Sequence, residues 1–139
     1  MDRQKYDDYG GEALILPLVR LAMRNEDFRV ALWTGEDMQV TLMSIPSRSD
    51  IGLECHTGLE QMLIAVSGSG IVRFGETKEN LSDPIRFAPG DAFMIPENTW
   101  HNVENRGRTP LKLISVYAPP QHPFGTVTPR KEDEEHIDD

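Results

Sequence analysis

Short runs of apolar residues, separated by turn-forming residues, dominate the chain from Phe28 onward. The runs 28–33, 61–66 and 111–117, for example, are each followed within two residues by glycine or proline, which interrupt or turn a β-strand. Many short strands joined by turns are typical of an all-β sandwich or barrel. The pattern predicts nine strands, at residues 28–33, 38–45, 51–56, 61–66, 71–74, 85–87, 92–95, 99–104 and 111–117.

The segment before the first strand has a different pattern. Residues 13–16 are apolar, Pro17 follows, and apolar residues then recur up to Met23. Because proline is disfavoured inside a helix, one continuous helix is not expected here. We expect a short extended arm followed by a helical turn near residues 21–25.

The length of 139 residues fits one domain with a core of its own. We expect a flexible polar N-terminus at residues 1–11, one folded domain at residues 12–127 and a disordered acidic tail at residues 128–139. In that tail six acidic residues stand against two basic ones, which favours a solvated segment.

The formal net charge of −9 disfavours nucleic acid and anionic membrane surfaces as partners. No apolar run is long enough for a membrane-spanning helix, and the first eight residues lack the apolar stretch of a secretory signal. The single cysteine, Cys55, excludes an internal disulfide and fits a reducing compartment. We therefore expect a cytoplasmic protein that binds neither nucleic acid nor a membrane.

Side chains from separate segments of the chain suit a shared metal ion. Glu54 and His56 are two residues apart on an expected strand, so their side chains share a face, while Cys55 points the other way. A turn then lets Gln61 return beside them, and a rolled-up sheet can bring His101 from a distant strand. One carboxylate oxygen, two imidazole nitrogens and one amide oxygen suit Mn²⁺, Fe²⁺, Co²⁺, Ni²⁺ or Zn²⁺.

These residues alone leave alternatives open. Glu60 competes with Gln61 for the ligand position, since either could follow the turn and strand alternation allows only one of them. Each candidate, taken singly, is more often a surface or hydrogen-bonding group than a ligand. We expect Trp100 to face away from the site, His122 to be a surface histidine and His136 to be solvated in the tail.

One set of spaced residues resembles the second signature of the cupin superfamily. It consists of Gly90, Pro96, Asn98, His101 and Asn105 at the family's spacing. Asn98 stands where cupins usually have glycine, but asparagine tolerates the left-handed conformation better than most residues, so the turn can survive. We expect Asn105 to fix a turn rather than to contact substrate.

A second set resembles the first cupin signature, which is His-x-His, four residues, Glu, six residues, Gly. Glu54, His56, Gln61 and Gly68 keep this spacing, with Glu54 in place of the first histidine and Gln61 in place of the glutamate. The interval to Gly68 favours Gln61 over Glu60 as the metal position. The four residues Glu54, His56, Gln61 and His101 resemble a permutation of the ligand set of phosphomannose-isomerase-type cupins.

The resemblance spans about residues 29–120. Residues 75–81 and 117–120 also look like those of small bacterial single-domain cupins that are labelled phosphomannose-isomerase-like. The resemblance to cupins implies a single-domain jelly-roll β-barrel that holds a divalent metal ion (Zn, Mn, Fe, Ni or Co) at its open end. Cupins are often homodimers, and residues 13–19 could supply an arm that pairs across the interface or could pack on their own barrel.

The function implied by the resemblance is a metal-dependent isomerase of a small polar metabolite, such as a sugar or a sugar phosphate, in which Glu54 or a bound water moves a proton. A phosphosugar would also require a cation near the metal, for which Arg73, Arg86 and Lys112 are candidates. A non-catalytic metabolite sensor and an Fe²⁺-dependent dioxygenase are the alternative functions.

Overall fold

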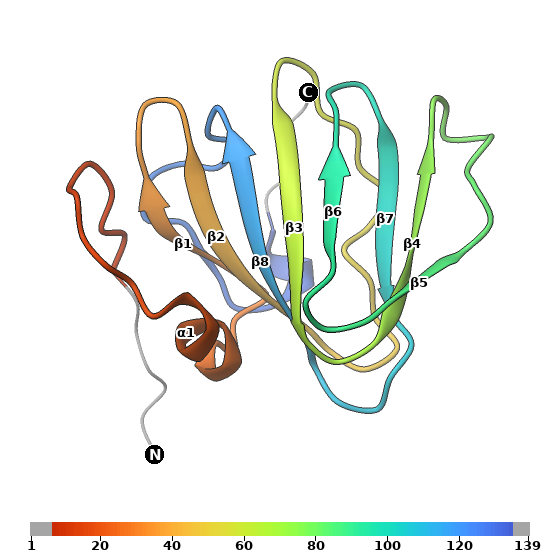
Figure 1. Ribbon diagram of the computed structural model, residues 1–139, viewed down its shortest axis with the longest axis horizontal. Coiled ribbons are helices and arrows are strands. Elements are labelled where there is room, and N and C mark those ends of the chain that lie inside the picture. The colour runs from red at the N-terminus through yellow and green to blue at the C-terminus, as the bar shows by residue number, and fades with distance from the viewer. Residues whose placement is uncertain (1–6, 135–139) are drawn as a thin grey trace.

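The computed structural model of the protein describes residues 7–134. Two antiparallel sheets face each other in this part of the chain (Figure 1). The six-stranded sheet has the order β6-β3-β8-β2-β1-β9, and the three-stranded sheet has the order β5-β4-β7. This arrangement confirms the predicted all-β jelly-roll fold. The elements are α1 (Leu18–Arg24), β1 (Arg29–Thr34), β2 (Gln39–Ile45), β3 (Glu60–Ser67), β4 (Gly70–Gly75), β5 (Ile85–Phe87), β6 (Ala92–Ile95), β7 (Trp100–Asn105), β8 (Leu111–Ala118), β9 (Val127–Thr128) and the 3₁₀ turn η1 (Lys131–Asp133).

Eight of the nine expected strands are present, and the exception is residues 51–56. This segment lies beside β7 and pairs with it through isolated bridges rather than a continuous ladder. The bridges join Asp50 with Glu104 and Glu54 with His101. Gly52 has a φ of 99°, a left-handed conformation that a regular strand cannot contain. The segment is therefore an irregular extension of the three-stranded sheet, and β9 is a short strand that the sequence pattern did not predict.

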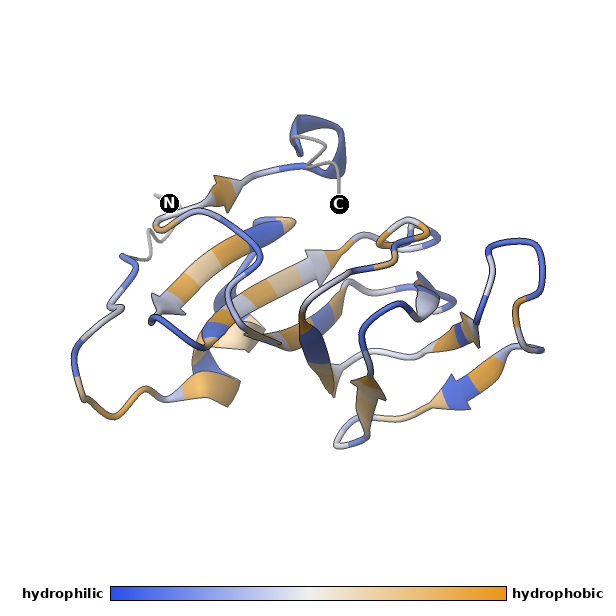
Figure 2. Cartoon of the chain, turned by 90° about the horizontal axis from the view of Figure 1, so that it is seen from above, coloured by the Kyte–Doolittle hydropathy of each residue, from blue (hydrophilic) through white to orange (hydrophobic). Residues whose placement is uncertain are grey.

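The apolar core lies between the two sheets and is built by strand alternation. On β3 and β8, every second side chain, such as Leu63 and Leu113, is fully buried on the inner face. The hydropathy view shows hydrophobic segments concentrated on the strands, whereas η1 near the C-terminus is hydrophilic (Figure 2). The buried members of this inner core are Phe28, Met43, Ile45, Ile51, Leu63, Ala65, Val72, Phe87, Phe93, Ile95, Val103, Leu111 and Leu113.

Helix α1 covers the outer face of the six-stranded sheet. It begins directly after Pro17, a residue that is tolerated only at the start of a helix. Leu18, Leu21 and Ala22 are spaced to lie on one helix face, and this face packs on the sheet. The other buried members of this outer cluster are Val30, Leu32, Leu42 and Ile114.

The arm before α1 is divided between its own sheet and solvent. Leu16 packs into the outer cluster. Ile15 is 95% exposed, and Val19, in the first turn of α1, is 63% exposed. The arm therefore packs partly on its own barrel, and its remaining apolar side chains are on the surface.

Both ends of the described chain, expected to be a flexible N-terminus and a disordered tail, contact the barrel. Asp8 accepts hydrogen bonds from the hydroxyl and the backbone N–H of Thr34, which ties residue 8 to β1. At the other end, Thr128 pairs with Arg29, and the Glu134 carboxylate forms an ion pair with the same arginine. Residues 128–134 thus differ from the expected disordered tail because the buried Arg29 guanidinium provides a partner for one of its carboxylates.

Candidate metal centre

His101 is presented to the interior by the alternation of β7. Its side chain is 1% exposed, and its Nδ1 atom lies 2.9 Å from the carbonyl oxygen of Thr99. Because a carbonyl oxygen can only accept, Nδ1 carries the proton and Nε2 is left with a lone pair. Nε2 is buried and has no hydrogen-bond partner among the described residues. This tautomer is the one that a metal ligand requires.

Burial also keeps His101 neutral. The low polarity around the ring lowers its pKa to about 4, and the neighbouring His56 adds to this effect, although the hydrogen bond to Thr99 opposes it. A neutral imidazole offers its lone pair to a metal ion near neutral pH, whereas an imidazolium cannot. The environment of His101 therefore suits metal ligation.

Glu54 and His56 reach the same place from the irregular segment beside β7. Two backbone hydrogen bonds of 2.9 Å join Glu54 to His101 and fix the register between these segments. The Nε2 atom of His56 lies 3.7 Å from a carboxylate oxygen of Glu54, and the rings of His56 and His101 are 5.6 Å apart between centroids. The sequence prediction that these three distant residues meet is confirmed.

The three side chains are close enough to bind one metal ion. One ligand atom of each lies within 4.8 Å of the others. Nitrogen and oxygen ligands lie about 2.0–2.2 Å from a first-row ion and hence at most about 4.4 Å from each other. A small rotation of the side chains would bring all three into contact with one ion.

Gln61 enters the inner face from β3. Its side chain is 6% exposed, and its Nε2 group donates a 2.9 Å hydrogen bond to the hydroxyl of Ser115. The opposite amide atom, Oε1, is buried without a hydrogen-bond partner among residues 7–134. An amide oxygen fixed in this way is a suitable ligand, and its burial without a partner is unfavourable unless something binds it. Glu60 is exposed on the other face of the same strand, so of the two competing residues only Gln61 points inward.

Asn98 supports the site from the turn before β7. Its φ of 62° confirms the left-handed conformation expected where cupins usually have glycine. Its backbone N–H donates a 2.7 Å hydrogen bond to the carbonyl oxygen of His56, and its side-chain oxygen accepts one from the hydroxyl of Thr57. The turn therefore fixes the backbone of one candidate ligand.

Asn105 and Trp100 have the structural roles expected for them. Asn105 donates hydrogen bonds to the carbonyl oxygens of Ile45 and Thr109 and accepts one from Gly107, which holds the turn after β7. Trp100 alternates with His101 on β7 and is half-buried, so it does not share the face of the site. His136 lies outside the described residues.

A buried polar group that the sequence pattern does not predict adjoins the candidate ligands. Arg29 on β1 is fully buried, and its Nη1 group donates a 2.7 Å hydrogen bond to the hydroxyl of Tyr117. The Tyr117 ring lies edge-on to His56, with 6.0 Å between centroids, and edge-on to His122 at 5.3 Å. The lone charged residue in the otherwise apolar run 28–33 is the sequence signal that could have identified Arg29.

His122 is part of this group and not the surface histidine that we expected. Its Nε2 atom is buried, and Gln39 holds its backbone by accepting from the N–H at 2.9 Å and donating to the carbonyl at 2.8 Å. Burial lowers the pKa of His122 to about 3, with smaller contributions from Arg29 and His56. The exit loop after β8 folds back so that His122 packs against Tyr117. The local sequence of the loop does not predict this contact.

The groups around Arg29 keep it protonated. Burial would lower its pKa, but Tyr117, Glu134 and Glu54 oppose burial and together raise the pKa above its ordinary value. Tyr117, which accepts a hydrogen bond from Arg29 and lies edge-on to His56, places the guanidinium beside the candidate metal ligands. A permanent positive charge therefore adjoins the site.

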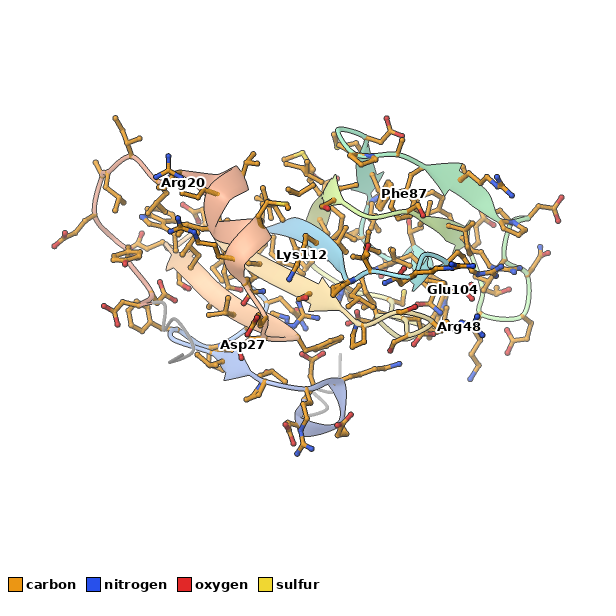
Figure 3. All side chains as sticks on the ribbon, turned by 90° about the horizontal axis from the view of Figure 1, so that it is seen from below. Arg20, Asp27, Arg48, Phe87, Glu104 and Lys112 are labelled. Carbon is orange, nitrogen blue, oxygen red and sulfur yellow. The ribbon has the colours of Figure 1, made fainter. Side chains whose placement is uncertain are left out.

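None of the three cations proposed from the sequence takes this position. Lys112 on β8 (Figure 3) alternates with Leu111 of the inner core and instead donates a 2.9 Å hydrogen bond to Ser44 on the neighbouring strand. Arg73 forms an ion pair with Glu104 at 3.5 Å, and Arg86 is exposed on β5. Arg29 is thus the cation that adjoins the site.

A two-sheet β-barrel with a Glu-His-His cluster between its sheets defines a class of small metal-binding domains. The chain belongs to the cupin family, because the family model described as "Cupin domain" matches residues 41–117. That range contains Glu54, His56, Gln61 and His101.

Relatives of known sequence or structure extend the match beyond this range. The chain is 48% identical over 126 residues to the uncharacterized protein YrkC of Bacillus subtilis (strain 168), covering 91% of this chain and 68% of that protein. It is similar to the crystal structure of BH2720 from Bacillus halodurans, with 46% identity, a TM-score of 0.90 and coverage of 91% of this chain and 96% of that one. The structure of TT1209 from Thermus thermophilus is 28% identical with a TM-score of 0.63, covering 76% and 96% of the two chains.

No helix in residues 7–134 is long and apolar enough to cross a membrane.

Proposed function

We propose that this protein is a metal-dependent enzyme that isomerises a small polar metabolite such as a sugar or a sugar derivative. The observation that supports this proposal is the convergence of Glu54, His56 and His101 within 4.8 Å. The buried Oε1 atom of Gln61 and Nε2 atom of His101 add two acceptors that lack a hydrogen-bond partner in the described chain. Acceptors of this kind fit a bound cation.

Glu54, His56, Gln61 and His101 would hold the divalent ion. The ion would supply a Lewis acid that polarises a carbonyl or hydroxyl group of the metabolite. Only one of the four ligands is a carboxylate, so the ligands contribute a charge of −1. A divalent ion held by them would keep a net positive charge and would attract electron-rich oxygen atoms. The nitrogen and oxygen donors fit Mn²⁺, Fe²⁺, Co²⁺, Ni²⁺ or Zn²⁺.

Glu54 is the residue that we assign to proton transfer. Its side chain is 25% exposed, whereas that of His56 is 4% exposed, so Glu54 is the more accessible of the two to an entering molecule. Its carboxylate would accept a proton from the hydroxyl-bearing carbon next to the carbonyl group and return it to the carbonyl carbon, while the hydroxyl proton passes to the carbonyl oxygen, which are the proton movements of an aldose–ketose isomerisation. His101 is neutral with its proton held by Thr99, so its role is to bind rather than to transfer a proton.

Solvent exchange tests this function. The purified protein is first analysed for its metals and reloaded with each candidate ion, and aldoses, ketoses and their phosphates are then incubated with it in D₂O. Isomerisation through a proton transfer incorporates deuterium next to the carbonyl group, which NMR detects. Glu54→Gln should lose this exchange.

The same experiment separates the alternative functions. Oxygen consumption by the Fe²⁺ form would indicate a dioxygenase. Tight metabolite binding without deuterium exchange or oxygen uptake would indicate a non-catalytic sensor. Either result would overturn the isomerase proposal while leaving the metal site intact.

We also propose that the protein is a homodimer. The exposed apolar side chains of the arm and the start of α1, Ile15 and Val19 among them, support this proposal because apolar surface of this kind favours association. Sedimentation velocity measures the mass directly, and a monomer at all concentrations tested would contradict it.

A further inference from the structure

We infer that Arg29 is a carboxylate-binding subsite beside the candidate metal centre, and that Glu134 occupies it as an internal substitute for a carboxylate of the substrate. This inference deepens the proposed function and rests on it for the chemistry, because it narrows the substrate to sugar derivatives that carry a carboxylate and are thus hydroxy or keto acids. The subsite itself can be tested without a metal ion.

The geometry at Arg29 is that of carboxylate recognition. The Nε group donates to one oxygen of Glu134 at 2.8 Å, and the Nη2 group donates to the other oxygen at 3.3 Å. Two parallel hydrogen bonds from one edge of a guanidinium match the two oxygens of a carboxylate. The remaining Nη1 group donates to Tyr117 and so fixes the plane of the guanidinium.

The two partners differ in their access to solvent. The Arg29 side chain is 0% exposed, whereas that of Glu134 is 22% exposed. Besides the Glu134–Arg29 pair, residues 130–134 contact the barrel through a solvent-accessible ion pair between Lys131 and Asp50, and η1 is a single turn of three residues without buried side chains. Exposed ion pairs contribute little stability, so this segment can leave while the buried arginine stays in place.

The position of Arg29 relative to the candidate ligands suggests a use for the charge. Its hydrogen-bond partner Tyr117 lies edge-on to His56, with 6.0 Å between the ring centroids. A hydroxy or keto acid has a carboxylate for the arginine and a second oxygen for the metal ion. A buried ion pair that served only to hold the C-terminal segment would gain little stability, because both charges lose their hydration.

Acetate binding by the variant Glu134→Ala tests the subsite. The variant removes the internal carboxylate, so acetate should bind in its place. In the unchanged protein the tethered Glu134 competes at an effective concentration in the millimolar range, so we expect acetate to bind the variant at least about tenfold more tightly. Calorimetric titrations of the full chain, freed of metal with 1,10-phenanthroline, measure both affinities.

Glu132→Ala is the matched control. It removes the same charge two residues earlier, but Glu132 is 68% exposed and pairs with Arg130 at the surface. Acetamide, which has the shape of acetate without its charge, controls for simple filling of the space. Equal acetate affinity in the two variants, or equal affinity for acetate and acetamide, would overturn the inference.

Hydrogen exchange in the unchanged protein gives a second readout that does not depend on a variant. Acetate should increase the exchange of a peptide covering residues 127–134, because it releases Glu134, and sodium chloride at the same concentration should not. No difference between the two salts would show that Glu134 is a fixed structural partner.

The two proposals can fail separately. Acetate binding by Glu134→Ala in a protein that never retains a metal would leave the subsite and end the proposed metal-dependent function. Metal retention in a protein whose Glu134→Ala variant does not bind acetate would end the subsite and leave the proposed metal-dependent function. Acetate binding that appears only after metal is added would assign the acetate to the metal ion and overturn the subsite.

Discussion

Strands β3 and β8 carry apolar side chains at one end of the space between the sheets and polar side chains at the other. Ala65 pairs with Leu113 at the apolar end, whereas Gln61 pairs with Tyr117 further along the same two strands. Burial of apolar surface stabilises a fold by about 25 cal/mol per Å², but a buried polar atom without a partner costs about 1–3 kcal/mol. The apolar end therefore accounts for stability, and the polar end is retained at some expense of stability, as expected of a ligand site.

The largest effect that we expect comes from the polar end. His101→Ala should abolish metal retention, because it removes the imidazole that the Thr99 carbonyl orients toward the other candidate ligands. Elemental analysis of the purified variant measures this directly. His136→Ala, a change in the segment expected to be a solvated tail, should retain as much metal as the unchanged protein, and equal metal contents in the two variants would end the ligand assignment.

The matching change at the apolar end should affect stability instead. Leu113 is fully buried in the inner core, so Leu113→Ala should lower the free energy of unfolding by about 2–5 kcal/mol through lost burial and the cavity left behind. Urea denaturation measures this loss. Metal content per folded molecule should not change, and its loss in a folded Leu113→Ala protein would show that the two ends are not independent.

The sequence predicts the apolar end well because its information is local. Alternation along a strand is enough to place Leu63 and Leu113 inside, and the same rule puts His101 on the buried face of β7 and Trp100 on the other. The positions of Glu54 and His56 on one face also follow from their spacing, although Gly52 makes their segment an irregular extension of the sheet rather than a strand.

The polar end depends on contacts that no local pattern contains. Arg29 and Glu134 are 105 residues apart, and the acidic composition around Glu134 predicts a solvated tail. His122 lies in a proline-flanked loop, where a surface position is the ordinary expectation, yet its ring packs against Tyr117. Each of these residues is identified by its partner, so the structure is needed to find it.

The smallest effect that we expect comes from a change that should lower metal affinity without lowering the free energy of unfolding by more than about 1 kcal/mol. It therefore sharpens the comparison between the two ends. Gln61→Leu removes the buried Oε1 atom that lacks a partner among the described residues, together with the one hydrogen bond that Nε2 donates to Ser115. The free energy of unfolding of the metal-free protein should therefore stay within about 1 kcal/mol of its original value or rise, since an unsatisfied polar atom is replaced by an apolar one. Metal affinity measured by competition with a chelating dye should fall. If the metal-free variant instead lost as much stability as Leu113→Ala, Gln61 would belong to the structural core, and the polar end would have no donor beyond the Glu54, His56 and His101 cluster.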